Sequence, residues 1–156
     1  MIIQQLLREW PPGYGGVERV AHELASVWGG VVYSLDVQFK SHLNEDPLPV
    51  TYLRQSLQSF RLFGRLRLPL PSRSLRKLLL SSTPLHGHLP SPGVLLVLVL
   101  ARLIRPRRHV TVHWHCFLDT DRDSNACLFS VYQWLALRLV PQLSAVVTTS
   151  PLLALE

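Results

Sequence analysis

Four histidines stand in two pairs whose spacing could do chemistry. His86 and His88 are two residues apart, and so are His113 and His115. Side chains two apart on a strand point to the same face, so each pair can act together. Such histidines can ligate zinc, can hydrogen-bond a sugar hydroxyl or a reacting oxygen, or can simply cap strands. Metal-bound histidines usually have a carboxylate behind them, and the chain between the pairs contains none, so we predict no metal site.

A glycine-rich segment offers a second kind of site. Gly13, Gly15 and Gly16 lie between the apolar residues 2–7 and a segment with helical spacing of apolar residues at 17–28. Glycine permits tight turns and close approach of a ligand, and the start of the following helix presents free N–H groups to a phosphate or a polar sugar. The third glycine of the dinucleotide motif G-x-G-x-x-G is missing. A plain strand–helix turn is therefore the alternative.

The elements that must position these residues alternate along the chain. We predict strands over 2–7, 31–35, 50–53, the beginning of 83–92, 109–114 and 145–149, and helices over 17–28, 93–104 and 128–139. The basic region 55–81 predicts two short helices, the second over 72–80. This order predicts an α/β fold with a Rossmann-like parallel sheet and helices on both faces. Ligands of such sheets bind beyond the carboxyl ends of the strands, where the glycines, Asp36 and both histidine pairs fall.

Length and composition fit a single globular domain over residues 1–156. The chain is 47% hydrophobic, and no apolar run reaches the ~20 residues of a membrane span. The N-terminal apolar run is too short for a signal peptide, so we expect a cytoplasmic location. Cys116 and Cys127 have neither metal-type nor redox spacing, and we expect reduced thiols.

The net charge of +6 is unevenly placed, because no Asp or Glu occurs between Pro47 and Leu118. A basic stretch without acids favours an anionic partner, either a membrane surface, a phosphorylated substrate or nucleic acid. Little aromatic interleaving argues against nucleic acid. A solvated helix whose arginine stems cover the core is the alternative. The candidates for a membrane or anionic-acceptor surface are Arg61, Arg65, Arg67, Arg73, Arg76 and Lys77.

Four segments together resemble the N-terminal half of a GT-B-fold glycosyltransferase of the retaining family 4. Residues 11–19 resemble the family's glycine-rich first loop, and 85–92 resemble its strand that ends in His-x-His-x-Pro. Residues 110–115 resemble its strand that ends in an aromatic residue and histidine, and 145–151 resemble the last strand before the domain linker.

The resemblance implies a domain that holds a glycan or lipid-linked acceptor and contacts the sugar of a nucleotide-sugar donor. It implies that His115 contacts the transferred sugar near the reacting carbon, and that Gly15 and Gly16 bring N–H groups to the donor phosphate. The further substrate-binding candidates are His88, His113 and Asp119. No cofactor besides the donor as co-substrate is implied. The basic region would then face a lipid-phosphate acceptor or the inner face of a membrane.

The family's second domain, which binds the nucleotide and carries an E-x7-E motif, has no counterpart in these residues. We therefore expect the chain alone to be inactive, and to work with a C-terminal half or a partner chain. A non-catalytic half that binds an acceptor or a membrane is one alternative. A dinucleotide-binding oxidoreductase domain with Asp36 as its ribose ligand is another, which the glycine spacing disfavours.

Overall fold

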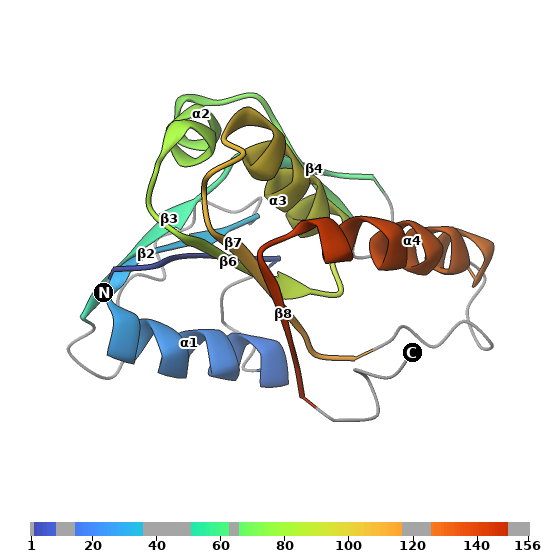
Figure 1. Cartoon of the computed structure of the whole chain (residues 1–156), viewed down its shortest axis with the longest axis horizontal. Coiled ribbons are helices and arrows are strands. Elements are labelled where there is room, and N and C mark those ends of the chain that lie inside the picture. Colours follow the sequence, from blue (N-terminus) through green and yellow to red (C-terminus); the bar gives the residue numbers. More distant parts are fainter. Residues whose placement is uncertain (1, 9–14, 36–50, 63–65, 117–125, 150–156) are drawn as a thin grey trace.

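The computed structural model describes residues 2–8, 15–35, 51–62, 66–116 and 126–149. Its centre is a six-stranded parallel sheet in the order β3-β2-β1-β6-β7-β8 (Figure 1). The strands of this sheet are β1 (Gln4–Leu7), β2 (Gly30–Ser34), β3 (Tyr52–Ser56), β6 (Leu85–Leu89), β7 (Val110–Trp114) and β8 (Ala145–Thr148). The predicted α/β, Rossmann-like fold is confirmed.

Helices cover both faces of the sheet. Helix α1 (Gly16–Trp28) lies on one face, and α2 (Arg73–Leu80) and α3 (Pro92–Ile104) lie on the other (Figure 1). Helix α4 (Ala126–Leu139) packs against α3 and continues through a 3-10 turn (Val140–Gln142) toward β8. Among the described residues, no helix combines the length and the apolar character needed to cross a bilayer.

Two glycines follow α1, whose predicted end at residue 28 is confirmed. Gly29 has φ 64° and Gly30 has φ 90°, a left-handed region that residues with a Cβ rarely adopt. A Cβ on Gly30 would also lie 2.6 Å from the backbone oxygen of Ile3. The chain can therefore turn at once from α1 into β2, beside the start of β1.

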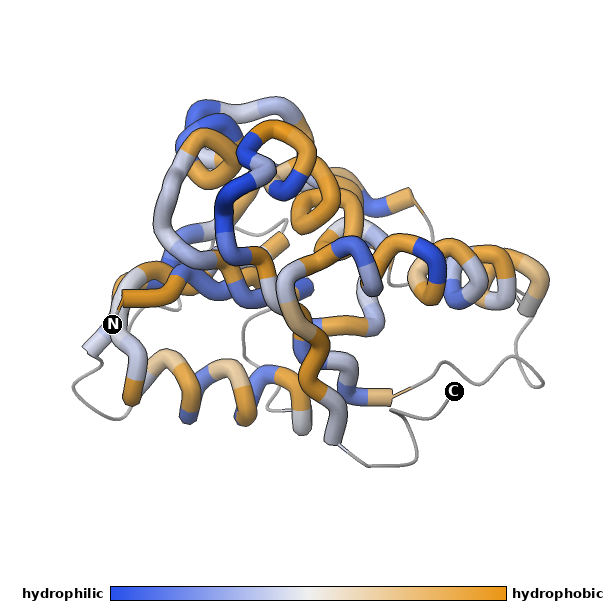
Figure 2. Tube along the Cα trace, viewed as in Figure 1, coloured by the Kyte–Doolittle hydropathy of each residue, from blue (hydrophilic) through white to orange (hydrophobic). Residues whose placement is uncertain are grey.

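The main core lies between the sheet and α3, whose sequence is apolar nearly all round (Figure 2). Leu78, Leu85, Val94 and Leu98 are fully buried there. The opposite face carries a smaller core under α1, where Ala21 and Ala25 pack close to the strands. The helix with small residues thus leaves room for larger polar side chains on its face of the sheet.

The first of the two helices predicted in the basic region is wrong. Residues Ser59–Arg61 (β4) and Arg67–Pro69 (β5) form an antiparallel pair instead. This pair is tied to the main sheet, since the hydroxyl of Ser59 donates to the carbonyl of Leu35 at 2.7 Å. The second helix, α2, is confirmed, and the hydroxyl of Ser72 caps it by accepting from the backbone N–H of Leu75.

Candidate functional site

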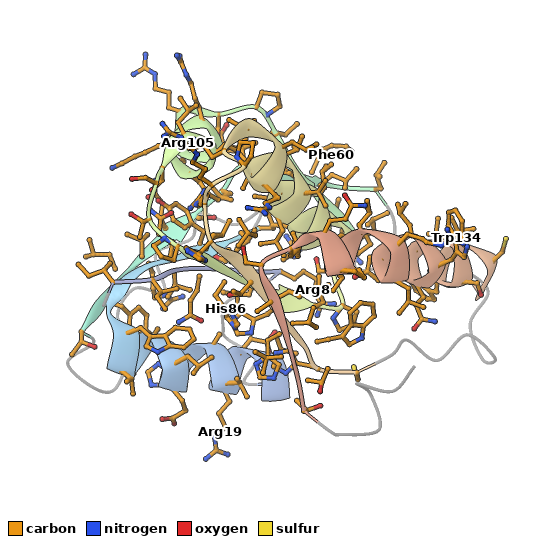
Figure 3. The ribbon with its side chains drawn as sticks, viewed as in Figure 1. Arg8, Arg19, Phe60, His86, Arg105 and Trp134 are labelled. Carbon is orange, nitrogen blue, oxygen red and sulfur yellow. The ribbon has the colours of Figure 1, made fainter. Side chains whose placement is uncertain are left out.

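Strand β6 sends its histidines and its aliphatic residues to opposite faces. His86 packs edge-on against Trp28 of α1 with ring centroids 5.3 Å apart, so the histidine face lies under α1 (Figure 3). Gly87 faces α3, and a Cβ there would lie 2.5 Å from Cδ1 of Leu98. The two histidines of this His-Gly-His sequence therefore place their rings on the face covered by α1. The glycine between them leaves room for Leu98 on the face covered by α3.

Strand β7 places two more histidines beside them. His113 is the register partner of His88, and Thr111 is the partner of His86. His115 follows the end of β7, where its backbone N–H still donates to the carbonyl of Leu89. The rings of His113 and His115 stack with centroids 4.1 Å apart. The structure thus brings all four predicted histidines into one cluster, which extends from His86 near the start of β6 to His115 just beyond the carboxyl end of β7.

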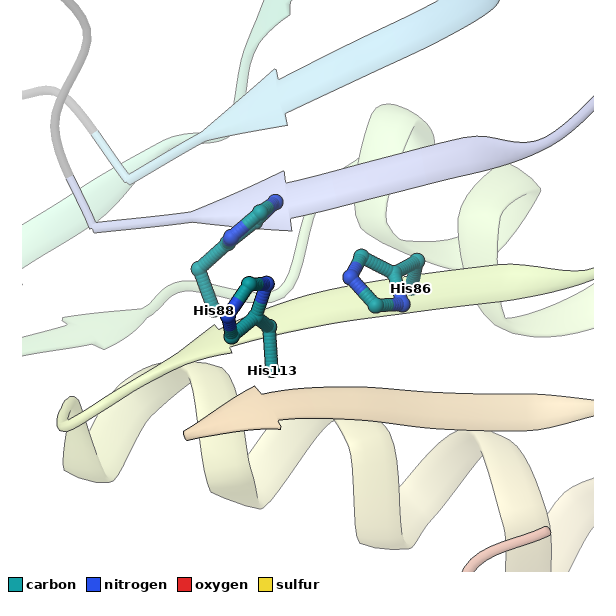
Figure 4. Close-up of side chains that lie close together, drawn as sticks. All are labelled: His86, His88 and His113. Carbon is teal, nitrogen blue, oxygen red and sulfur yellow. The ribbon is translucent and has the colours of Figure 1, made fainter. Parts of the chain in front are cut away.

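Some of the ring nitrogens of this cluster have hydrogen-bond partners, and others have none. Nε2 of His88 lies 2.9 Å from Oε1 of Gln5, and its Nδ1 lies 3.1 Å from Nε2 of His115. Nδ1 of His86 lies 2.8 Å from the hydroxyl of Thr111. Nε2 of His86 and Nε2 of His113 are buried and have no hydrogen-bond partner in the described part of the chain (Figure 4). Two buried ring nitrogens, and also the amide nitrogen Nε2 of Gln5, therefore lack, within the described residues, the partner that buried polar atoms normally have.

Burial keeps all four imidazoles neutral at neutral pH. Desolvation, followed by repulsion from the neighbouring histidines, lowers the pKa of His86 to about 4. The same causes lower the pKa of His115 to about 4. The pKa of His88 is also well below its ordinary value, and that of His113 is lowered by desolvation. Neutral imidazole offers one lone pair and one N–H, so the cluster can accept hydrogen bonds or ligate a cation.

The glycine-rich turn lies at the same edge of the sheet. Gly15 is the N-cap of α1 and Gly16 its first residue; both are exposed. A Cβ on Gly16 would meet nothing within 4 Å. Helix α1 begins at the edge of the sheet where β1, β6 and β7 end (Figure 1). Its first turn therefore presents backbone N–H groups beside the carboxyl ends of these strands.

The predicted site residues differ in how far they are buried. His88 is 1% exposed, whereas His113 and His115 are half-buried and closer to solvent. Asp119 lies outside the described residues, as do Asp36 and Arg65.

The basic residues do not join the histidine cluster. Arg73, Arg76 and Lys77 are exposed on α2, which packs on α3 across the sheet from α1. Arg61 and Arg67 face each other as register partners in the β4–β5 pair. The described members of the candidate basic surface therefore lie on α2 and in the β4–β5 pair, away from the histidine cluster.

Two polar residues of the cluster were missed in the sequence. Gln5 is fully buried in β1, and Thr111 contacts His86 from β7. Their signal was available: Gln5 is a polar residue inside an apolar strand, and Thr111 lies two residues before His113, on the same strand face.

Comparisons with known proteins place this chain in no family. No protein-family model, no curated protein and no solved structure matches it. Function is therefore inferred from the fold and from the residues of the site.

Proposed function

We propose that this chain is the acceptor-side domain of a retaining glycosyltransferase of the GT-B type, which transfers a sugar from a nucleotide-sugar donor to a glycan or lipid-linked acceptor. The observation that supports this most is the position of His115. His115 is half-buried and directly follows β7, which ends at the edge of the sheet where α1 begins (Figure 1). A ligand at this edge can reach both the imidazole and the first turn of the helix.

The sheet order supports a ligand at this place. Strands β1, β2 and β3 run outward in one direction, and the chain then returns to place β6 on the other side of β1. Open α/β sheets bind ligands beyond the strand ends at such a reversal. The open space at Gly16 and the free N–H groups of α1 suit a phosphate.

The chemistry of sugar transfer matches these groups. The acceptor oxygen bonds to the anomeric carbon, the bond from that carbon to the diphosphate oxygen breaks, and the acceptor proton is released. Negative charge grows on the diphosphate and positive charge on the sugar. The lowered pKa of His115 keeps its imidazole neutral. It can therefore hydrogen-bond a sugar hydroxyl without repelling the positive sugar.

A second domain, in the same polypeptide or in a partner chain, would supply nucleotide binding. Exposed apolar side chains on α4 and β8 support such a contact, because apolar surface of this kind marks interaction sites. Trp134 is 59% exposed on α4, and Val147 is 46% exposed on β8. The basic face of α2 supports a cytoplasmic protein at an anionic membrane, where a lipid-linked acceptor would be found.

Nuclear magnetic resonance titrations of the isotope-labelled chain test the proposal. We expect UDP-glucose or GDP-mannose to shift the amide signals of Gly15 and Gly16 and the ring signals of His115. His115→Ala should weaken this binding, whereas the exposed His109→Ala should leave it unchanged. Binding of NADH in place of the sugar nucleotides would support the oxidoreductase alternative. Binding of neither class would refute a contact of this domain with the donor, and with it the roles given to Gly15, Gly16 and His115.

Vesicle flotation tests the membrane part separately. Replacing Arg73, Arg76 and Lys77 together by Gln should release the chain from phosphatidylglycerol vesicles, since each cation near such a surface contributes about 1 kcal/mol. His115→Ala is the matched control and should float like the parent chain. If the triple variant still floats, α2 is not the membrane contact. Flotation without any sugar-nucleotide binding would favour a membrane-surface protein that is not a transferase.

A further inference from the structure

We propose that His86, His88 and His113 form a binding site for a divalent transition-metal ion that prefers imidazole, with Zn²⁺ as the reference ion. One nitrogen of each ring lies within 4.8 Å of one nitrogen of each of the others. A tetrahedral Zn²⁺ with Zn–N bonds of about 2.0–2.1 Å holds its ligand nitrogens about 3.3 Å apart. Small ring rotations therefore suffice to close the site. This inference does not depend on the proposed function.

The main evidence for a bound ion is the pair of unpartnered ring nitrogens in the cluster. Nε2 of His86 and Nε2 of His113 are buried without a hydrogen-bond partner in the described residues, and His86 is 4% exposed. A buried polar atom without a partner is costly, so two of them side by side indicate that something else binds there. A cation that accepts two lone pairs satisfies both nitrogens at once.

The second layer of residues fixes which nitrogen of each ring is free. The carbonyl oxygen Oε1 of Gln5 can only accept, so Nε2 of His88 carries the proton and Nδ1 keeps its lone pair. The hydroxyl of Thr111 can accept from Nδ1 of His86, which leaves the lone pair on Nε2. Metal-bound histidines typically donate their other N–H to an oxygen in this way. The sequence offered no carboxylate for this role, which argued against a metal. In the structure, the amide oxygen of Gln5 and the hydroxyl of Thr111 take that role instead.

His115 sets the fourth position. Its Nε2 lies 3.1 Å from Nδ1 of His88 and must donate the proton of that hydrogen bond, because Nδ1 holds a lone pair. His115 therefore occupies the nitrogen that the ion needs, and has to turn aside when the ion binds. Three protein ligands then leave one position open toward the half-buried rim, as in zinc sites that bind water or substrate.

The ligand type selects the ion, because all three proposed ligands are imidazole nitrogens. Imidazole ligands suit Zn²⁺, Cu²⁺ and Ni²⁺ and disfavour Mg²⁺ and Ca²⁺, which prefer oxygen.

Metal titration of the tag-free chain tests the inference. We expect calorimetry to show one Zn²⁺ per chain, and Co²⁺ to give the intense visible bands of a tetrahedral site. Mg²⁺ should give no heat. His86→Gln and His113→Gln should each weaken Zn²⁺ binding by at least about tenfold, and Thr111→Val by about 10- to 100-fold. The exposed His109→Gln is the matched control and should bind like the parent chain.

Circular dichroism of each variant shows whether it is folded, and Thr111→Val keeps all three ligands, so a folding defect in one ligand variant does not end the test. His115→Ala should bind Zn²⁺ at least as tightly as the parent chain, since it removes the competing hydrogen bond. Weaker binding in that variant would overturn the three-histidine ligand set. The site would be overturned if the folded chain bound no Zn²⁺, or if His86→Gln and His113→Gln bound Zn²⁺ as tightly as the parent chain. A buried water would then be the partner of the two nitrogens.

Discussion

Acidification is expected to destabilise this protein through its histidine cluster. The pKa values of His86 and His115 are about 4 in the folded chain, against an ordinary value of 6.5. The unfolded chain therefore binds more protons than the folded chain between about pH 4 and pH 6.5. Stability is highest above this window and falls as the pH is lowered through it.

The magnitude follows from the two pKa values. Lowering the pH from about 7.5 to about 5 costs about 2 kcal/mol for His86, because one pKa unit corresponds to about 1.4 kcal/mol. His115 adds less, since its ring is more exposed and solvent screens it. A cost of about 2 kcal/mol or more is a substantial part of the roughly 5–15 kcal/mol that holds an ordinary domain folded. No carboxylate of the described residues hydrogen-bonds these rings in a way that would offset this cost.

Urea unfolding at a series of pH values, with a chelator present to exclude metal, measures this effect. His86→Gln should reduce the loss of unfolding free energy between about pH 7.5 and pH 5 by about 2 kcal/mol. The exposed His109→Gln should retain the loss seen in the parent chain. If His86→Gln lost as much stability on acidification as the parent chain, the cause assigned to the cluster would be refuted.

Four further substitutions test the packing, all by urea unfolding. Arg108→Met should lower the free energy of unfolding by about 2–4 kcal/mol, because the buried guanidinium of Arg108 donates to three oxygens of neighbouring segments. An unchanged free energy of unfolding would show that these hydrogen bonds contribute nothing. Leu78→Ala should cost about 2–5 kcal/mol, since Leu78 is fully buried against α3, and a cost below about 1 kcal/mol would mean that the core collapses around it. Gly93→Ala should lower the free energy of unfolding by about 1–3 kcal/mol, because the new Cβ would clash with the backbone oxygen of Arg67. The new Cβ of Gly16→Ala would meet open space, so this variant should be as stable as the parent chain or more stable. Equal effects of the two substitutions would contradict the packing around Gly93.

Much of the fold could be predicted because each element carries its own local signal. Helix α3 is an apolar run that begins at Pro92 and ends before a cluster of arginines, and β7 is a run of β-branched residues. The alternation of such segments leaves few arrangements other than a parallel sheet. The boundaries shifted where the signal was weak: the third strand was predicted over 50–53 and lies at Tyr52–Ser56.

The β4–β5 pair could not be predicted from local pattern. Alternating Arg and Leu residues suit a basic helix and a strand equally well, and the choice falls to contacts made elsewhere. The hydroxyl of Ser59 bonds the carbonyl of Leu35, and the backbone of Arg67 lies against Gly93. These contacts join residues far apart in the sequence, since Ser59 and Leu35 are separated by 24 residues.

The candidate site was partly visible in the sequence, because paired histidines two apart on a strand share one face. What the sequence could not supply was the neighbour across the sheet. Gln5 is 83 residues from His88, and only the pairing of β1 with β6 brings its carbonyl to the ring. The tautomer of His88, and with it the direction of its lone pair, depends on that contact.

The central position of β1 has a consequence for the order of folding. Its register with β6 pairs Gln5 with His86, and the bond from Arg108 to Gln4 closes a separation of 104 residues. Long loop closures slow folding, since their entropy is lost before the contacts that compensate it are made. During synthesis, β1 can pair with β2 early, but its other edge stays open until β6 has left the ribosome. Over that interval Leu6, which lies on the face that α3 later covers, stays exposed, and we expect the nascent chain to depend on a chaperone there more than at any other segment of the sheet.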